Sequence, residues 1–355
     1  MILTHNFSDL LETLCRGDDL TETEAGALFE AVFAGEVDAV RLGAILAALK
    51  AKGESSAEIR GAAKAMLAAA AAFPRPADLE IGEIVGTGGD GARTINISTT
   101  AALAAAGAGL FVAKHGNRAV SSLSGASDVL TALGVEVAVT PEQAAQTLVE
   151  TGFTFCFAPV YHPAMKFAAP VRRELGVRTI FNLLGPLTNP ARPDYALIGV
   201  YDPALLMTTA ETLKGLGVKR AFVVHGAGLD EVAVHGETQA VELTEVGDLI
   251  PKVFRPVDFG VTRDYRAEDL AGGTPEVNAR ITETLLAGGG TPAQRDCVAA
   301  NLALLILLGK KAATLPEAVA SARRTLENGA GLRVLAHLRE KSAEGERRAA
   351  LWPRF

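Results

Sequence analysis

The sequence predicts an α/β protein, with a small all-helical domain followed by a larger domain whose mainly parallel sheet is flanked by helices. Three observations support this prediction. The chain has 355 residues, which is more than one ordinary domain needs. Residues 1–80 show only the apolar spacing of helices. From residue 80 onwards, short apolar runs alternate with alanine-rich helical stretches, which is typical of parallel strands joined by helices.

The amino-terminal part is expected to form four helices. Apolar residues recur at helical spacing in Phe7–Cys15, Thr21–Ala34, Asp38–Ala51 and Ser56–Ala72. Thr21, Asp38 and Ser56 are the expected N-caps, because their side-chain oxygens can accept hydrogen bonds from free backbone N–H groups. The proline-rich segment Phe73–Ala77 then breaks the helical pattern and predicts a boundary or hinge.

We therefore expect a helical domain over residues 1–76 and an α/β domain over residues 77–355. The expected strands are Glu83–Val85, Leu110–Ala113, Glu136–Val139, Phe153–Ala158, Ala196–Val200 and Ala221–His225, with helices such as Thr99–Ala106, Ser127–Leu133 and Pro141–Thr151 between them. We expect a small hairpin at His235–Leu243 and further helices over Pro275–Leu338. Ligands of such sheets bind beyond the carboxyl ends of the strands, so the loops after strands are the candidate sites.

The composition limits the function. The chain carries 34 basic and 41 acidic side chains, and this acidic balance argues against a nucleic-acid or membrane-surface partner. The cysteines, Cys15, Cys156 and Cys297, are scattered and are expected to be free thiols. The start of the chain lacks a signal-peptide pattern, and the apolar stretch Cys297–Gly309 is too short to cross a bilayer. We therefore expect a cytoplasmic protein.

Two polar segments follow the first strand of the larger domain. In Gly86–Gly91, glycines let backbone N–H groups approach an anion, and Asp90 could meet a ligand hydroxyl or order the loop. A glycine turn without a ligand is the alternative. The next segment, Thr94–Thr100, enters a helix whose positive dipole end suits phosphate, and Ser98 is the expected N-cap there. Together the segments favour a phosphate site.

The densest polar segment is Lys114–Gly125, which follows the next strand. It contains two cations, a histidine, an amide and three serines. Lys114 can act as a point charge for phosphate, and the serines can donate hydrogen bonds. A solvated loop is the alternative, but it does not require this mixture after a buried strand.

Four further features are ambiguous when taken alone. His162 lies among aromatic and apolar residues and is more often structural there. Arg172 could pair with a carboxylate, but the pattern alone favours a solvated arginine. The segment Phe181–Pro190 is expected to be a long apolar loop, either a pocket wall or a buried connection. Asp230 and Glu231 follow a strand and suit Mg²⁺, with two solvated acids as the alternative.

Together these motifs resemble those of the anthranilate phosphoribosyltransferase family. Gly86–Asp90, Asn96–Thr99, Lys114–Ser122, Asn182–Pro190 and Asp230-Glu231 occur in the order and at the approximate spacing of that family. The likeness spans nearly the whole chain, and only the charged tail after the last helical pattern looks longer than usual. The resemblance implies a helical domain, joined by a returning helical segment near residues 162–190, and a larger α/β domain, with the active site between them. It also implies a homodimer.

The resemblance implies transfer of a phosphoribosyl group from phosphoribosyl pyrophosphate to anthranilate, in tryptophan biosynthesis. The donor-binding residues that it implies are Gly86, Thr87, Gly88, Gly89, Asp90, Thr94, Asn96, Ile97, Ser98, Thr99, Lys114, His115, Gly116, Asn117, Arg118, Ala119, Val120, Ser121, Ser122 and Ala126. Those implied for anthranilate are Gly86, His115, Asn117, His162 and Arg172, with Arg172 facing the carboxylate. Ser98, Asp230 and Glu231 would ligate Mg²⁺. Lys114 and Arg172 would be catalytic.

This reaction needs no strong general base, because an arylamine is neutral at pH 7 and already nucleophilic. It needs neutralisation of the leaving pyrophosphate, which Mg²⁺ and Lys114 would supply. A pyrimidine-nucleoside phosphorylase is the nearest rival, but Asn96–Thr99 combined with Asp230-Glu231 argues against it. A non-catalytic nucleic-acid-binding relative is the other rival, and it should be basic and lack the donor motifs.

Overall fold

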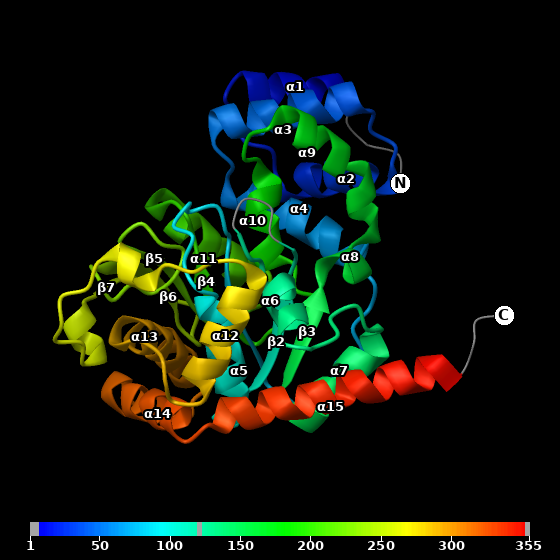
Figure 1. Cartoon of the computed structure of the whole chain (residues 1–355). Helices are drawn as coiled ribbons and strands as arrows, with labels where there is room; N and C mark the ends of the chain where they lie inside the picture. The colour runs from blue at the N-terminus through cyan, green and yellow to red at the C-terminus, as the bar shows by residue number, and fades with distance from the viewer. Residues whose placement is uncertain (1–6, 119–122, 352–355) are drawn as a thin grey trace.

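A computed structural model describes residues 7–118 and 123–351, with side chains described as far as Glu344 (Figure 1). The four expected amino-terminal helices are confirmed as α1 (Phe7–Cys15), α2 (Glu22–Ala34), α3 (Ala39–Lys52) and α4 (Ser56–Ala68). Thr21 and Asp38 cap α2 and α3 as expected. The expected cap Ser56 is wrong. Ser55 has the extended backbone of a cap and accepts the N–H of Glu58, whereas Ser56 already lies in the helix.

The larger part is built on one seven-stranded sheet. Its strands are β1 (Ile81–Gly86), β2 (Phe111–Gly116), β3 (Phe153–Phe157), β4 (Tyr195–Gly199), β5 (Arg220–Gly226), β6 (Thr238–Leu243) and β7 (Leu249–Phe254). They lie in the order β3-β2-β1-β4-β5-β6-β7, and the first five are parallel while β6 and β7 run antiparallel. The carboxyl ends of β2, β1, β4 and β5 therefore meet at one edge of the sheet.

Helices cover both faces of the sheet, and side chains alternate between the faces. Leu197 and Phe222 pack in a core shared with α5 (Ile97–Gly107) and the carboxyl-terminal helices. Their neighbours Ala196 and Val223 pack in a second core with the amino-terminal helices. The helices not yet placed are α6 (Ala126–Ala132), α7 (Pro141–Thr151), α8 (Ala158–Tyr161), α9 (Ala169–Leu175), α10 (Ile180–Leu187), α11 (Leu206–Gly215), α12 (Pro275–Leu286), α13 (Pro292–Leu308), α14 (Leu315–Glu327) and α15 (Ala330–Leu351).

The helical part lies at one end of the molecule. Figure 1 shows α1, α2, α3 and α9 grouped together, with α15 running along the opposite end. Helices α9 and α10 come from the middle of the chain, yet Val171 and Leu184 pack in the same core as Leu28 of α2 and Ile45 of α3. A segment between β3 and β4 therefore joins the amino-terminal helices.

Several expectations for the larger part are wrong in detail. Glu136–Val139 forms no strand. Val137 is buried and Val139 is half-buried, and the N–H of Glu136 bonds to Ser342 at 2.8 Å instead of to a partner strand. The hairpin spans Thr238–Phe254 rather than His235–Leu243. The sequence pattern did not indicate β7, because this strand carries a lysine and a proline. The expected loop Phe181–Pro190 is mostly helix α10.

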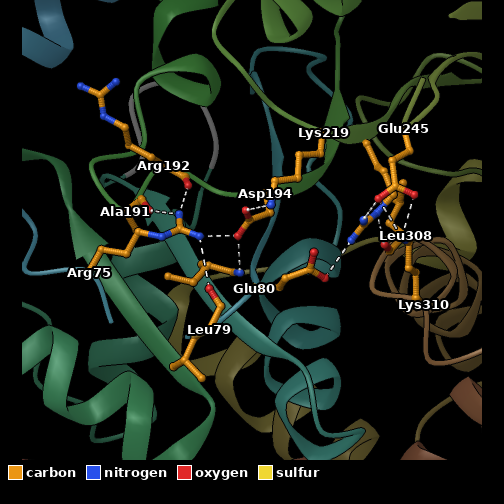
Figure 2. Close-up of polar contacts among 12 residues, drawn as sticks. Arg75, Leu79, Glu80, Ala191, Arg192, Asp194, Lys219, Glu245, Leu308 and Lys310 are labelled. Carbon is orange, nitrogen blue, oxygen red and sulfur yellow. Dashed lines mark hydrogen bonds and ion pairs between the residues drawn. The ribbon is translucent and has the colours of Figure 1, made fainter. Parts of the chain in front are cut away.

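Charged side chains tie the amino-terminal ends of β1, β4 and β5 together (Figure 2). The carboxylate of Asp194 pairs with the Lys219 ammonium at 2.9 Å and with the Arg75 guanidinium. Arg220, at the start of β5, donates to the Leu308 carbonyl at 2.8 Å. An open groove of about 800 Å³ borders this network. None of the expected donor-binding residues lines that groove. The candidate residues Gly86 and Gly116 lie instead at the carboxyl ends of β1 and β2.

Candidate active site

The glycine-rich loop after β1 is held by a carboxylate from the loop after β5. The N–H of Gly88 donates to Oδ2 of Asp230 at 2.6 Å. A Cβ at Gly86 would lie 2.1 Å from the same oxygen, so only glycine fits beside Asp230. Asp90 accepts the N–H of Ala92 at 3.0 Å, which orders the turn. Gly88 and Gly89 both have positive φ, a conformation that glycine adopts without strain.

Lys114, Ser98 and Glu231 form the next part of the same cluster. The Lys114 Nζ donates to Ser98 Oγ at 3.2 Å and to the Ile84 carbonyl at 2.6 Å. The Ser98 N–H donates to Glu231 Oε1 at 3.1 Å. The expectation that Ser98 is an N-cap is wrong. Asn96 holds that position, and Ser98 lies in the first turn of α5, where its unpaired N–H is free for Glu231.

Burial and neighbouring charges shift the pKa values of the ionisable side chains in this cluster. Burial raises the pKa of Glu231 to about 7, although Lys114 opposes the shift. Burial and the neighbouring carboxylates of Glu231 and Asp90 raise the pKa of Asp230 well above its usual value. Burial lowers the pKa of Lys114, against the attraction of Glu83 and Glu231. Carboxylates placed so close together favour a bound cation, because it would compensate their mutual repulsion.

The oxygens of the cluster fit a magnesium ion only if other ligands complete the shell. Among the described residues, no group of three or more histidine, cysteine, aspartate or glutamate side chains could hold a metal by itself. Ser98, Asp230 and Glu231 offer one hydroxyl and two carboxylates. Mg²⁺ suits such a set because it commonly binds one or two carboxylates together with waters and substrate phosphates.

A second group of candidate residues lies on the other face of β2. Lys114 and His115 are neighbours inside this strand, not after it as expected, so their side chains point to opposite faces. His115 Nδ1 lies 2.9 Å from the Gly185 carbonyl, and His162 Nε2 lies 3.0 Å from the Thr188 carbonyl. The two rings are 5.0 Å apart. Burial lowers the pKa of His115 to about 3 and that of His162 to about 4, so both rings are neutral at pH 7.

The other two residues expected to bind the acceptor, Arg172 and Asn117, lie in separate segments of the chain. Arg172 lies on α9 with its guanidinium 5.2 Å from the centre of the Phe181 ring. Asn117 is exposed after β2, and its Oδ1 accepts the N–H of Arg118. Within the described part of the chain, no hydrogen bond or ion pair joins Arg172 to the Lys114 cluster. An acceptor path would therefore run between α9 and the end of β2.

The remaining expected donor residues are placed unevenly. Ile97 and Thr99 are each 1% exposed, so their side chains belong to the core of α5. Thr94 pairs with Ala271 in an isolated bridge. Three more expected donor residues lie at or beside the ends of elements. Thr87 directly follows β1, Gly116 ends β2 and Ala126 begins α6. Ala119, Val120, Ser121 and Ser122 lie outside the described residues.

Sequence reasoning missed two buried asparagines in the carboxyl-terminal helices. Asn278 of α12 donates to Asn96 Oδ1 at 2.8 Å. Asn301 of α13 accepts the Val232 N–H at 3.0 Å and returns a hydrogen bond to the Val232 carbonyl at 3.0 Å. Each asparagine therefore holds a segment that carries candidate site residues. An asparagine inside an apolar helix was the available signal, because a buried amide must find partners.

Comparisons with known proteins agree with this arrangement. The glycosyl transferase family a/b domain matches residues 79–332, and the helical bundle domain of the same family matches residues 8–70. An anthranilate phosphoribosyltransferase from Tolumonas auensis is 52% identical over 322 residues, which cover 91% of this chain and 95% of that protein. The chain belongs to the anthranilate phosphoribosyltransferase family.

Solved anthranilate phosphoribosyltransferase structures share the fold. The protein from Thermus thermophilus has a TM-score of 0.89 and 43% identity, covering 94% of this chain and 99% of that chain. The protein from Saccharomyces cerevisiae, solved in complex with PRPP and Mg, has a TM-score of 0.86 and 28% identity, covering 95% and 98%. These likenesses confirm the expected fold class. No helix in the described part of the chain is long and apolar enough to cross a membrane.

Proposed function

We propose that the chain transfers the 5-phosphoribosyl group of phosphoribosyl pyrophosphate to the amine of anthranilate, giving N-(5-phosphoribosyl)anthranilate and pyrophosphate in tryptophan biosynthesis. One observation carries the proposal. A relative with this activity in its name is 52% identical over 91% of the chain. The hydrogen-bonded cluster of Gly88, Asp230, Ser98, Glu231 and Lys114 supports it, because one anionic sugar could contact all of these groups.

We place the donor against the loop after β1 and the first turn of α5. The backbone N–H groups of Gly86–Gly91 and the start of α5 would bind its phosphates. Lys114 would neutralise charge that develops on the leaving pyrophosphate. We assign Mg²⁺ to Ser98, Asp230 and Glu231, where it would supply further positive charge to the pyrophosphate when bound.

We place the acceptor between α9 and the end of β2. Arg172 would pair with the carboxylate of anthranilate, because a guanidinium matches a carboxylate with two parallel hydrogen bonds. The neutral rings of His115 and His162 would line the path without adding charge. No side chain needs to remove a proton before attack, since the arylamine is neutral. The residues therefore act by orienting the amine towards the anomeric carbon.

We further propose that the chain is a cytoplasmic homodimer and that its helical domain comprises residues 1–76 together with a returning segment near 162–190. The shared core of α2, α3, α9 and α10 supports this division.

The direct test mixes the protein with Mg²⁺, phosphoribosyl pyrophosphate and anthranilate and follows the loss of anthranilate fluorescence. Turnover that requires all three components is expected. A protein that is folded but leaves the fluorescence unchanged would exclude the proposed function. Replacing anthranilate by a pyrimidine nucleoside and phosphate tests the rival phosphorylase.

A further inference from the structure

One arginine outside the expected site touches the glycine-rich loop directly. Arg178 lies between α9 and α10, in the segment that packs with the amino-terminal helices. Its Nη2 donates to the carbonyl oxygen of Gly89. A Cβ built at Gly89 would lie only 3.3 Å from Arg178 Nε, so the guanidinium rests against the loop itself. The contact joins two segments that are 89 residues apart in the chain.

A tyrosine fixes the guanidinium from the other side. The Cζ of Arg178 lies 4.1 Å from the centre of the Tyr201 ring, which is a close cation–π stack. Tyr201 is itself attached to the glycine-rich loop, because its N–H donates to Thr87 Oγ1 at 3.1 Å. The N–H of Thr87 donates in turn to the Gly199 carbonyl at the end of β4. Arg178 therefore sits on a platform that is anchored to the loop it holds.

The charge of Arg178 is not used elsewhere in the described part of the chain. Arg178 is an exposed residue, and no carboxylate of the described residues forms an ion pair with it. Holding the Gly89 carbonyl also fixes the next peptide plane. In a planar trans peptide the N–H of Asp90 points away from the Gly89 carbonyl. Arg178 thereby sets the direction of an N–H in the loop that we assign to the donor.

We propose that Arg178 is a positioning residue that links the acceptor-side helical segment to the donor loop and orients that loop for phosphoribosyl pyrophosphate. This proposal rests on the proposed function. Arg172 lies within α9, whereas Arg178 lies in the short connection between α9 and α10. Arg172 would meet the acceptor, whereas Arg178 acts on the donor through the backbone of Gly89.

The test compares Arg178→Ala with the wild-type protein. Loss of one charge-assisted hydrogen bond and its stack should raise the KM for phosphoribosyl pyrophosphate about tenfold. The KM for anthranilate and kcat should change less than about threefold. Arg178→Lys keeps the cation but loses the planar stack, so it should restore the donor KM only partly. Arg173→Ala, an exposed arginine on α9, is the matched control and should leave the donor KM unchanged.

Tyr201→Leu tests the platform. If stacking on the Tyr201 ring holds Arg178 in place, Tyr201→Leu should also raise the donor KM. The double variant should then have the same donor KM as Arg178→Ala alone. Titration calorimetry of phosphoribosyl pyrophosphate with Mg²⁺ measures donor binding without turnover. Normal donor affinity in a folded Arg178→Ala protein, or a rise in the anthranilate KM alone, would overturn the proposal while leaving the function intact. Absence of donor binding by the wild-type protein would overturn both.

Discussion

Replacing Asn301 by leucine should disturb both stability and magnesium dependence. Asn301 is 0% exposed, and its amide bonds the N–H and the carbonyl of Val232. Val232 is equally buried and directly follows Glu231. Leucine has a similar size but cannot form either bond. The change therefore leaves the Val232 N–H unpaired, next to a proposed metal ligand, and the Val232 carbonyl keeps only the weak bond from Cys297 Sγ at 3.5 Å.

The expected loss can be worked out from these contacts. An unpaired buried polar group costs about 1–3 kcal/mol, so the unpaired N–H and the poorly satisfied carbonyl together cost at most roughly 2–6 kcal/mol. Burying the leucine side chain returns about 2 kcal/mol. At the middle of this range, the free energy of unfolding should therefore fall by about 2 kcal/mol. Because Val232 can shift, Glu231 should move too, and the Mg²⁺ concentration for half-maximal activity should rise several-fold.

Urea unfolding gives the stability, and initial rates at varied Mg²⁺ give the activation constant. Leu304→Ala is the matched control, since Leu304 is buried in the same helix and its truncation should cost about 2–5 kcal/mol. It should leave the Mg²⁺ requirement unchanged. The reasoning is refuted if Asn301→Leu is as stable as the wild-type protein, or if both variants show the same Mg²⁺ requirement.

Three further predictions concern the site itself. Asp230→Asn combined with Glu231→Gln should cut turnover and raise the Mg²⁺ requirement, and wild-type Mg²⁺ dependence would remove this pair from the site. Arg172→Ala should raise the KM for anthranilate more than that for the donor, whereas an unchanged anthranilate KM would discard its role. The pKa of His115 is about 3 in the folded protein and 6.5 ordinarily, so the unfolded state takes up the proton as pH falls below 6.5. By pH 5 this costs the folded state about 2 kcal/mol, so between pH 8 and pH 5 His115→Asn should lose about 2 kcal/mol less unfolding free energy than wild type. Equal losses in urea titrations would contradict the assigned pKa.

The sequence predicted the fold class where patterns were strong. Apolar strand runs and glycine-rich turns located β1 and the loop at Gly86–Gly91, because backbone geometry there depends on local residue types. The prediction of secondary structure failed where tertiary contacts determine the local conformation. Glu136–Val139 has a strand-like composition, but side-chain hydrogen bonds replace a partner strand. Strand β7 escaped notice because Pro251 and Lys252 suit an exposed edge.

The candidate site was predictable only in part for a similar reason. Motifs at or after the ends of strands identified Lys114 and Glu231, since the carboxyl ends of parallel strands converge. The partners that hold them come from distant segments, and a single polar residue in a helix carries no sign of its target. Asn278 reaches Asn96 over 182 positions, and Arg178 reaches Gly89 over 89 positions. Such pairings can be predicted only when the order of the strands in the sheet is known.

The amino-terminal ends of the strands stabilise the fold, whereas their carboxyl ends carry the candidate site. Arg75, Asp194 and Arg220 lock the amino-terminal ends through ion pairs and carbonyl contacts, far along the strands from Lys114. A protein engineer seeking heat tolerance should therefore begin at that locked end. Substitutions there can strengthen the scaffold without the usual trade-off against activity, because the candidate ligand-binding loops leave the opposite edge of the sheet.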